Sequence, residues 1–393
     1  MNDEILLIHY WQLPEDLFVS LKDNFHKRFC LKIKEKTNYN FKNCFHRILY
    51  CPKWHAQRLF TKYTRFTIKE LEVLRKFAEI SEQEVEKEIE SLGNHEDGAI
   101  IKNPNLPFHS KDIFYVASHL IFDGSFRFKH GCYFYAYEDS LVEYHKKRLL
   151  AFGEVPINLI KRENHLYFSY TIGYIVSKVL DIETFKSTKC YLSKRFKELA
   201  KENKILVDEV VKALIIDEGA VEDKIEVELS NKQLVEDLYE IINFYYELTK
   251  ITTRTREFCF KLNPKWIYIS NVWKIGFSAS SFKNLFLSIS PLPIDYKQEN
   301  LEFLYKVKTC GWKQRKHHGE TRRLIVLSLL NKPKTLSELA KELCMKQTTI
   351  SAYIKKLPVI TKVNEKILRR GGYSRVNVFG IRDISNAQEF LSK

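Results

Sequence analysis

The sequence has no apolar run long enough to cross a membrane. Spanning a bilayer as a helix needs roughly 18 consecutive apolar residues, and no stretch of the chain reaches that length. The N-terminal segment Met1–Gln12 is acidic, whereas a secretory signal begins with positive charge. We therefore expect a cytoplasmic protein that has no membrane partner.

The eight cysteines are scattered and include no CxxC pair. Cys44, Cys51 and His55 can be proposed as zinc ligands, but their spacing is irregular and no fourth ligand stands out. Reduced structural thiols are the simpler interpretation of these residues.

Composition and charge indicate a folded protein with an anionic partner. The 393 residues are 45% hydrophobic and 13% aromatic, which suits two or three globular domains. The net charge is +15, and between Lys308 and Arg375 there are 17 Lys and Arg against 4 Asp and Glu. Because the positive excess is concentrated near the C-terminus, that region is expected to bind a polyanion such as nucleic acid.

Residues 1–110 are predicted to form a helical domain. Capping boxes at Thr67–Glu70 and Ser81–Glu84 mark two helix starts, and residues 31–49 have the two-run shape of a helix-turn-helix. A small DNA-binding domain and a plain helical scaffold both fit this pattern. The turn-rich stretch 93–110 is typical of a linker.

Residues 111–206 and 207–299 are predicted to be two copies of one α+β unit with the element order αββαββα. Each copy opens with an apolar helical run, Val116–Gly124 or Val211–Gly219, that contains a small residue, Ser118 or Ala213. We expect the copies to pack about a pseudo-two-fold axis, with these two helices as neighbours at that axis.

Each of these helices ends in an acid followed by glycine, Asp123-Gly124 and Glu218-Gly219. A carboxylate at a helix C-terminus opposes the helix dipole, and two such ends brought together repel each other. A bound divalent cation reverses both effects, and oxygen ligands of this kind suit Mg²⁺. The acids therefore predict a magnesium site formed by Asp123 and Glu218.

Residues 300–393 are predicted to form a basic linker and a winged helix-turn-helix. Helices are expected at 321–331, 336–343 and 347–357, followed by a hairpin about Gly371-Gly372. The residues expected to face base edges are Gln347, Thr348, Thr349 and Ser351. Those expected to contact phosphates are Lys355, Lys356, Arg369, Arg370 and Arg375. A protein-binding winged helix is the alternative, and the local charge excess disfavours it.

In these features the chain resembles the monomeric, two-repeat LAGLIDADG (DOD-type) homing endonucleases over about residues 111–291. Val116–Gly124 and Val211–Gly219 match the nine motif positions, although Ile121 and Ile216 replace an acid at the sixth. The resemblance implies that Asp123 and Glu218 are catalytic and hold Mg²⁺, with the peptide groups of Gly124 and Gly219 as further ligands.

The resemblance also implies that the strands lie in the major groove of DNA. The basic residues expected to contact DNA from these strands are Arg127, Lys129, Lys161, Arg162, Lys250, Arg254 and Arg256, with Thr252 on the same face. Glu226 and Glu228 would read cytosine or lie at an edge, and Lys178 or Lys283 would be a charge-stabilising lysine. His119 is expected to be a packed core histidine, and Asp217 either a solvated neighbour or a reserve ligand.

Together these features predict a monomeric, Mg²⁺-dependent endonuclease that binds a long, non-palindromic duplex and leaves short 3′ overhangs. The chain lacks the terminal His-Asn of a protein-splicing element and is therefore expected to be free-standing. Two alternatives are a non-catalytic transcription regulator that retains a LAGLIDADG fold, and an intron maturase that binds RNA.

Overall fold

The structure is a computed structural model of the chain, and its described residues form two compact units. These residues are 6–37, 41–94, 100–127, 131–222, 224–259, 267–309, 318–343, 345, 347–369 and 373–392. One unit comprises residues 1–219 and 227–275, and the other comprises residues 220–226 and 276–393. This division is coarser than the four segments predicted from the sequence, whose boundaries it does not test. Across the described ranges every helix is too short or too polar to cross a membrane.

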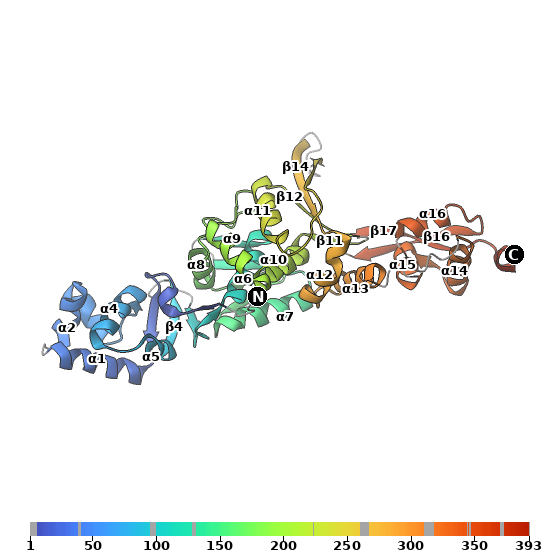
Figure 1. The fold of residues 1–393 in the computed structure, drawn as a ribbon. Coiled ribbons are helices and arrows are strands. Elements are labelled where there is room, and N and C mark those ends of the chain that lie inside the picture. The colour runs from blue at the N-terminus through green and yellow to red at the C-terminus, as the bar shows by residue number, and fades with distance from the viewer. Residues whose placement is uncertain are drawn as a thin grey trace. The chain divides into compact units, whose positions relative to one another are not determined.

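The N-terminal part is mixed α and β (Figure 1), so its predicted helical character needs correction. Its helices are α1 (Asp23–Thr37), α2 (Phe41–Leu49), α3 (Lys53–Phe60), α4 (Ile68–Ala78) and α5 (Glu82–Lys87), with a 3₁₀ turn at Tyr10–Gln12. Its strands are β1 (Leu7–Ile8), β2 (Phe18–Leu21), β3 (Phe66–Thr67), β4 (Ile89–Gly93), β5 (Ile100–Lys102) and β6 (Phe108–His109). The sheet order is β3-β2-β4-β5, and β1 pairs separately with β6.

The stretch 93–110 is not simply a linker. It contains β5, which pairs with β4, and β6, which pairs with β1 from the start of the chain. These strands have only two or three residues, too few for an alternation pattern to be seen in the sequence. The Thr67–Glu70 capping box is complete: the Thr67 hydroxyl accepts from the Glu70 amide, and the Glu70 carboxylate accepts from the Thr67 amide. At Ser81 the hydroxyl accepts from the Glu84 amide, whereas the Glu84 carboxylate accepts from Arg28, so Ser81 is an N-cap and the predicted reciprocal box does not form there.

The segment after the N-terminal part contains the first predicted αββαββα order. Its elements are α6 (Ser110–Phe122), β7 (Gly124–Arg127), β8 (Gly131–Tyr135), α7 (Asp139–Leu149), β9 (Ile157–Ile160), β10 (His165–Phe168) and α8 (Tyr170–Val179), with a 3₁₀ turn at Leu150–Phe152. The strands form an antiparallel sheet in the order β7-β8-β10-β9. An additional helix, α9 (Lys194–Glu202), was not predicted.

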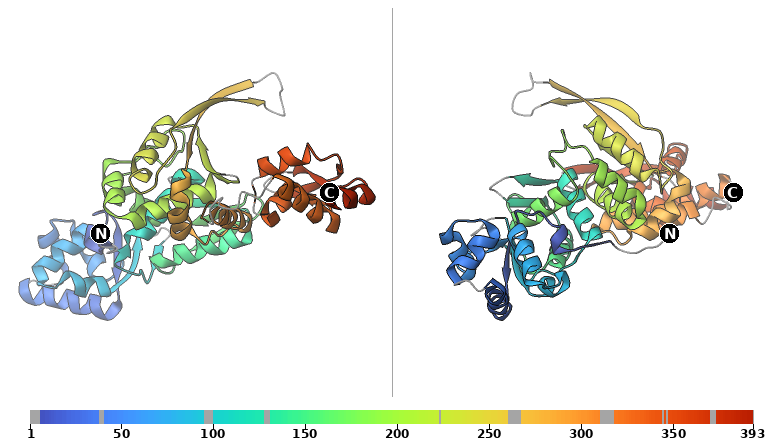
Figure 2. Two further views of the ribbon diagram at one scale, coloured as in Figure 1. Left: turned by 45° about the vertical axis from the view of Figure 1, so that its right-hand side comes forward. Right: turned by 60° about the vertical axis from the view of Figure 1, so that its left-hand side comes forward.

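The same element order then occurs a second time. The elements are α10 (Lys204–Asp217), β11 (Gly219–Val221), β12 (Ile225–Leu229), α11 (Lys232–Ile242), β13 (Thr252–Cys259), β14 (Ile267–Gly276) and α12 (Phe282–Ile289), with a 3₁₀ turn at Ala279–Ser281. The sheet order is β11-β12-β14-β13, so in both segments the strands run first, second, fourth, third. Strands β13 and β14 form a ribbon that extends away from the helices (Figure 2).

Helices α6 and α10 pack against each other in the core of the first unit. Every residue of α6 from Ile113 to Phe122 is buried, which is typical of a core helix rather than an amphipathic surface helix. The two small residues noted in the sequence, Ser118 and Ala213, are both fully buried. The Ser118 hydroxyl donates to the Phe114 carbonyl of its own helix at 2.7 Å, so its burial leaves no unpaired donor.

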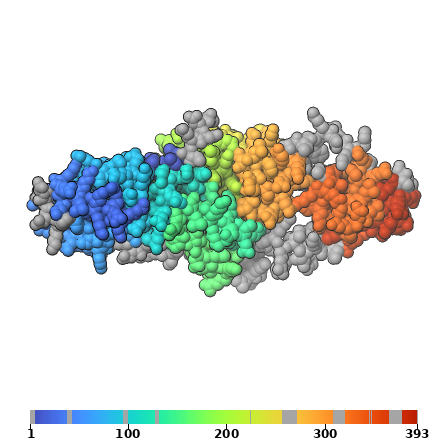
Figure 3. All heavy atoms as spheres, turned by 90° about the horizontal axis from the view of Figure 1, so that it is seen from below, coloured from blue at the N-terminus to red at the C-terminus, as the bar shows by residue number. Residues whose placement is uncertain are grey.

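Helix α7 covers one side of this core and reaches the surface (green in Figure 3). Its inward face carries Leu141, Val142 and Leu149, and also the buried imidazole of His145. A histidine at this spacing lies on the apolar face of the helix, so its ring enters the core beside α6.

The second unit contains the fold predicted for the C-terminal segment. Its elements are α13 (Asp295–Thr309), α14 (His318–Asn331), β15 (Lys334–Thr335), α15 (Leu336–Leu343), α16 (Gln347–Ile354), β16 (Ile360–Arg369), β17 (Tyr373–Ile381) and α17 (Ile384–Ser392). The three strands pair in the order β15-β17-β16 around a core that includes Ile325, Leu339 and Ile350. The predicted helices and hairpin are present, whereas β15 and α17 were not predicted.

We predict that Gly124→Ala destabilises the first unit by about 1–3 kcal/mol, a typical cost of overpacking a core. A Cβ at this position would lie 2.7 Å from the His119 carbonyl oxygen and 2.8 Å from the Leu120 Cα. Chemical denaturation measures the change. Ser125→Ala, at the next and partly exposed position, is the control and should change stability by less than about 0.5 kcal/mol. Equal effects of the two changes would contradict the close-packing explanation.

Candidate functional site

The predicted acids lie at the C-terminal ends of the two packed helices. Asp123 is the C-cap of α6 and Glu218 is the C-cap of α10, and both are partly exposed. Their backbone N–H groups donate to the carbonyls of His119 and Leu214, at 3.2 and 3.0 Å, which closes the last turn of each helix. The two helix ends therefore have closely similar local geometry.

The glycine that follows each acid is required by packing. A Cβ on Gly219 would lie 2.7 Å from the Ile215 Cα and 2.8 Å from the Ile215 carbonyl oxygen, and Gly124 is similarly close to its own helix. Each strand starts directly beside the last helical turn, so no side chain fits there. Packing therefore accounts for the glycine of each acid-glycine pair. Coordination by the peptide groups of Gly124 and Gly219 stays a prediction.

A buried hydrogen bond joins the two helices close to these ends. His119 Nδ1 lies 2.8 Å from Asp217 Oδ2, and the two side chains are only 2% and 3% exposed. His119 is one turn before Asp123, and Asp217 immediately precedes Glu218. The contact therefore brings the C-terminal ends of α6 and α10 to the same end of the helix pair. His119 is a packed core residue as predicted, and Asp217 is not a solvated neighbour.

His119 is neutral in this environment. Burial, together with the positive charges of Arg148 and Lys212, lowers its pKa to about 3. A neutral imidazole has one N–H, and the position of Asp217 assigns it to Nδ1, which donates to the carboxylate. His119 Nε2 is buried without a hydrogen-bond partner in the described part of the chain.

More ionisable side chains are buried beside His119 than the sequence suggested. The Tyr115 hydroxyl lies 2.5 Å from His145 Nδ1, and burial lowers the pKa of His145 well below its ordinary value. Arg148 lies 3.0 Å from Glu209 and 3.3 Å from Asp112. The sequence does contain one indication that His145 is buried: it lies four residues after Leu141 and four before Leu149, on the apolar face of α7.

Lys212 belongs to the same buried cluster. Its ammonium lies 5.3 Å from the centre of the Tyr144 ring, and burial lowers its pKa. The two lysines proposed from the sequence, Lys178 on α8 and Lys283 on α12, are instead exposed.

Mg²⁺ commonly binds one or two carboxylates and keeps several waters, so binding of Mg²⁺ by Asp123 and Glu218 stays a prediction. Within the described residues, no group of three or more His, Cys, Asp or Glu side chains is arranged to hold a metal. Among the possible zinc ligands, His55 Nε2 lies 2.7 Å from Glu70 Oε1, in the cap of α4.

The DNA contacts predicted on the repeated segments are only partly placed. Lys161 and Arg162 are exposed at the turn between β9 and β10, and Lys250 is exposed just before β13. Arg127 and Arg256 lie on β7 and β13 with side chains outside the described residues, and Lys129 also lies outside them.

Arg254 on β13 forms an ion pair with Glu228, an acid whose presence on a strand expected to face DNA was unexplained. Its guanidinium lies 2.6 Å from Glu228 on β12, and Lys274 on β14 lies 3.9 Å from the same carboxylate. Glu226 forms an ion pair with Lys224. Both acids therefore sit beside basic side chains, and neither needs a cytosine to balance its charge.

Helix α16 in the second unit presents a polar face opposite its buried one. Ile350 and Ile354 point into the core, whereas Thr348 and Lys355 are exposed on the other side. Lys356 is also exposed, and Gln347, Thr349 and Ser351 are partly exposed. Arg369 on β16 and Arg375 on β17 have side chains outside the described residues, as does Arg370 entirely.

Comparison with known proteins identifies this part of the chain. Residues 319–358 match the family described as bacterial regulatory protein, arsR family, a helix-turn-helix domain. The match covers most of α14, all of α15 and α16, and stops before the β16–β17 hairpin, which completes a winged fold. The comparison with curated proteins found no match. A helix-turn-helix of this type supports a DNA partner.

We predict that the first unit loses stability as the pH falls below 6.5, the ordinary pKa of histidine. Below that pH the histidines of the unfolded chain become protonated, whereas the buried His119 and His145 of the folded chain stay neutral. The free energy of unfolding therefore keeps falling until the pH approaches the folded pKa of about 3 for His119. Each histidine contributes a slope of up to about 1.4 kcal/mol per pH unit. Urea unfolding between pH 6.5 and 5 measures it. His145→Phe should reduce the slope by about one proton equivalent, and an unchanged slope would contradict the assignment.

Proposed function

We propose that the protein binds double-stranded DNA site-specifically through the winged helix of its second unit, in the manner of a transcription regulator. One observation carries the proposal: residues 319–358 match a helix-turn-helix family and fold with an exposed polar face on α16. In helix-turn-helix proteins the second helix enters the major groove and its N-terminal residues reach base edges. In this chain that helix is α16.

The side chains on α16 suit both parts of such an interface. Gln347, Thr348 and Ser351 have amide and hydroxyl groups that donate to and accept from base edges. Lys355 and Lys356 follow at the other end of the helix, exposed and positively charged, where they can contact phosphates. The basic hairpin residues Arg369, Arg370 and Arg375 are proposed as further phosphate contacts of the wing.

We predict that the double change Lys355→Glu/Lys356→Glu weakens duplex binding at least tenfold, because two attractive interactions with phosphates become repulsive. The slope of log affinity against log salt should become shallower by about 0.9 for each phosphate that is no longer neutralised. Fluorescence anisotropy with a labelled mixed-sequence duplex, titrated at several salt concentrations, measures both quantities.

The matched control is Lys194→Glu/Lys232→Glu, which changes the net charge equally at two exposed sites on α9 and α11. It should bind like the wild type. If both double variants weaken binding equally, only overall charge matters and the winged-helix assignment fails. If the wild type binds no duplex, the proposed function itself is wrong.

A second candidate is a LAGLIDADG-type endonuclease, favoured by the repeated architecture of residues 111–299. The two segments share their element order and their strand order, and an acid caps each of the two packed helices. In this candidate the two segments are pseudo-symmetric halves, and their sheets contact the DNA through Lys161, Arg162, Lys250 and Arg254.

Within this candidate the chain's residues would have distinct tasks. Asp123 and Glu218 would bind Mg²⁺, which when bound polarises a phosphodiester and a water. The His119–Asp217 hydrogen bond would keep the two helix ends together, so that both carboxylates face one phosphate. Asp217 itself, buried and bound by His119, would be a positioning residue and not a ligand.

We predict for this candidate that Asp123→Asn abolishes Mg²⁺-dependent cleavage of a duplex library while DNA affinity changes by less than about threefold, since removing a metal ligand affects chemistry more than phosphate binding. Glu218→Gln should behave alike. Sequencing the ends of cleaved library members would also reveal the overhang.

Lys194→Gln, at an exposed position on α9, is the surface control and should cleave like the wild type. Tight duplex binding by the wild type without any cleavage would eliminate the endonuclease and leave the regulator. Preference for structured RNA over duplex DNA in the same assay would instead favour the maturase alternative.

A further inference from the structure

A second charged surface lies in the N-terminal part of the chain. Residues 36–69 contain no Asp or Glu and eight basic residues: Lys36, Lys42, Arg47, Lys53, Arg58, Lys62, Arg65 and Lys69. Residues 70–90, by contrast, contain eight Glu against three Lys and Arg. The two stretches largely cancel in a sum over residues 1–110, which hides a strongly basic segment.

This basic stretch folds as a helix, a turn and a helix. Helix α2 ends at Leu49, Tyr50–Pro52 form the turn, and α3 starts at Lys53 and packs against α2. Tyr50 has a φ of 52°, the left-handed conformation that commonly ends a helix. The sequence pattern had placed a helix-turn-helix one helix earlier, at residues 31–49.

Helix α3 has one buried face and one exposed face. Ala56 and Leu59 are buried, and His55 is held by Glu70 of α4. On the other side Lys53, Trp54 and Gln57 are exposed. The second helix of the motif thus presents a basic, an aromatic and an amide side chain near its N-terminal end, where recognition helices contact DNA.

Large aromatic side chains are exposed around this face. Tyr50 is 92% exposed, Tyr63 is 76% exposed and Trp54 is 61% exposed. The Arg58 guanidinium lies 4.8 Å from the centre of the Tyr63 ring and 6.0 Å from that of Trp54. On such a surface the cations can contact the phosphates of a duplex, and exposed polar and aromatic side chains can contact its sugars and base edges.

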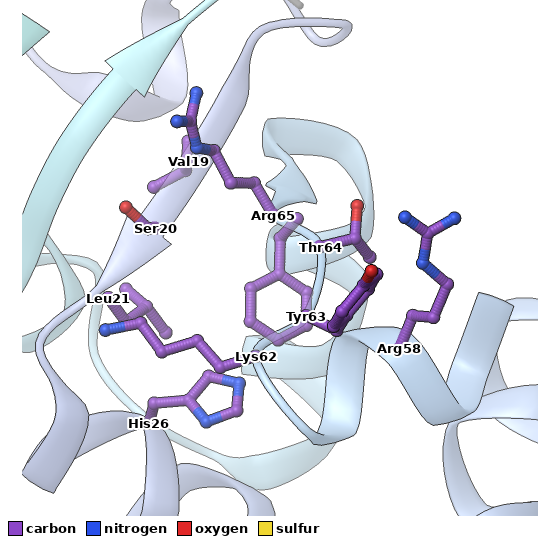
Figure 4. Close-up of a pocket in the computed structure, with 10 residues that line it drawn as sticks. Val19, Ser20, Leu21, His26, Arg58, Lys62, Tyr63, Thr64 and Arg65 are labelled. Carbon is purple, nitrogen blue, oxygen red and sulfur yellow. The ribbon is translucent and has the colours of Figure 1, made fainter. Parts of the chain in front are cut away.

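A pocket of about 280 Å³ opens beside this face. Arg58 and Arg65 project on either side of Tyr63 and Thr64 at its rim, as Figure 4 shows. Lys62 also lines it, with its ammonium held by Asp23 at 2.5 Å and Glu90 at 2.8 Å. The pocket combines two guanidinium groups with the hydroxyl groups of Ser20 and Thr64, a lining that suits a phosphate group.

We propose that this α2–α3 surface, comprising Arg47, Tyr50, Lys53, Trp54, Gln57, Arg58, Tyr63 and Arg65, is a second binding surface for duplex DNA. The positive charge of the surface indicates a polymer of phosphates as the partner. The helix-turn-helix arrangement indicates duplex DNA and not a single strand, because such a motif places its second helix in the major groove. The inference rests on the proposed function, because it extends DNA binding from the winged helix to a separate part of the chain.

The test uses the full-length chain, a labelled mixed-sequence duplex and the same strand unpaired. Arg47→Glu/Lys53→Glu reverses two exposed charges on α2 and α3, and Lys194→Glu/Lys232→Glu is the control of equal charge change. The first variant should bind the duplex at least about tenfold more weakly, with a salt slope shallower by up to about 1.8 because two phosphates are no longer neutralised. The control should match the wild type.

Trp54→Ala provides an independent readout. Removing the aromatic ring should weaken duplex binding severalfold, because the ring loses its contacts with sugars and base edges. Its salt slope should stay unchanged, because no charge is removed. If the variant merely unfolded the N-terminal part, its thermal unfolding midpoint would fall. The affinity and the salt slope would then change together, because the basic residues of this surface would be lost as well.

The outcomes distinguish this inference from the proposed function. If the α2–α3 variants bind like the wild type while Lys355→Glu/Lys356→Glu binds weakly, the inference is wrong and the winged helix stands. If the α2–α3 variants lose binding only to the unpaired strand, the surface does not bind the duplex. If the control weakens binding equally, net charge alone explains the effect. If the wild type binds no duplex, the proposed function and this extension both fail.

Discussion

The packing of α6 against α10 is the constraint on which the first unit depends. Helix α6 is buried from Ile113 to Phe122, and eight of the fourteen residues of α10 are buried, so side chains inside the core fix the position of one helix relative to the other. The His119–Asp217 hydrogen bond does this at their C-terminal ends. Removing the imidazole would leave the buried Asp217 carboxylate without this donor, which typically costs about 1–3 kcal/mol, or more for a charged group. The bond lies one turn before Asp123 and one residue before Glu218, at the same end of the helix pair as both acids.

The parts of the fold that the sequence predicted correctly are those encoded by local patterns. Apolar runs with helical spacing located α6 and α10, and the Thr335 capping box and following runs located α15 and α16. The two-residue strands β1, β3, β6 and β15 were missed, because their existence depends on partners far away in the chain. The acids were found as a repeated motif, and their common location depends on tertiary packing.

The polar core beside the helix pair shows where sequence reasoning fails. Tyr115 and Glu209 come from α6 and α10, which were expected to be neighbours. His145 and Arg148 come from α7, and no pattern in the sequence indicated that α7 packs beside that pair. Asp217 was judged from its position next to Glu218, and only its pairing with His119 reveals that it is buried. Summed charge was also misleading, since the acidic residues 70–90 concealed the basic residues 36–69 before them.

The His119–Asp217 bond is not duplicated between the two helices. Counted back from the acids, Leu214 occupies the position equivalent to His119, and Phe122 the position equivalent to Asp217. The contact therefore depends on one particular residue from each helix, an imidazole from α6 and a carboxylate from α10. A substitution at either position leaves the other side chain without this partner in the core, so the residues tolerated at one position depend on the residue at the other.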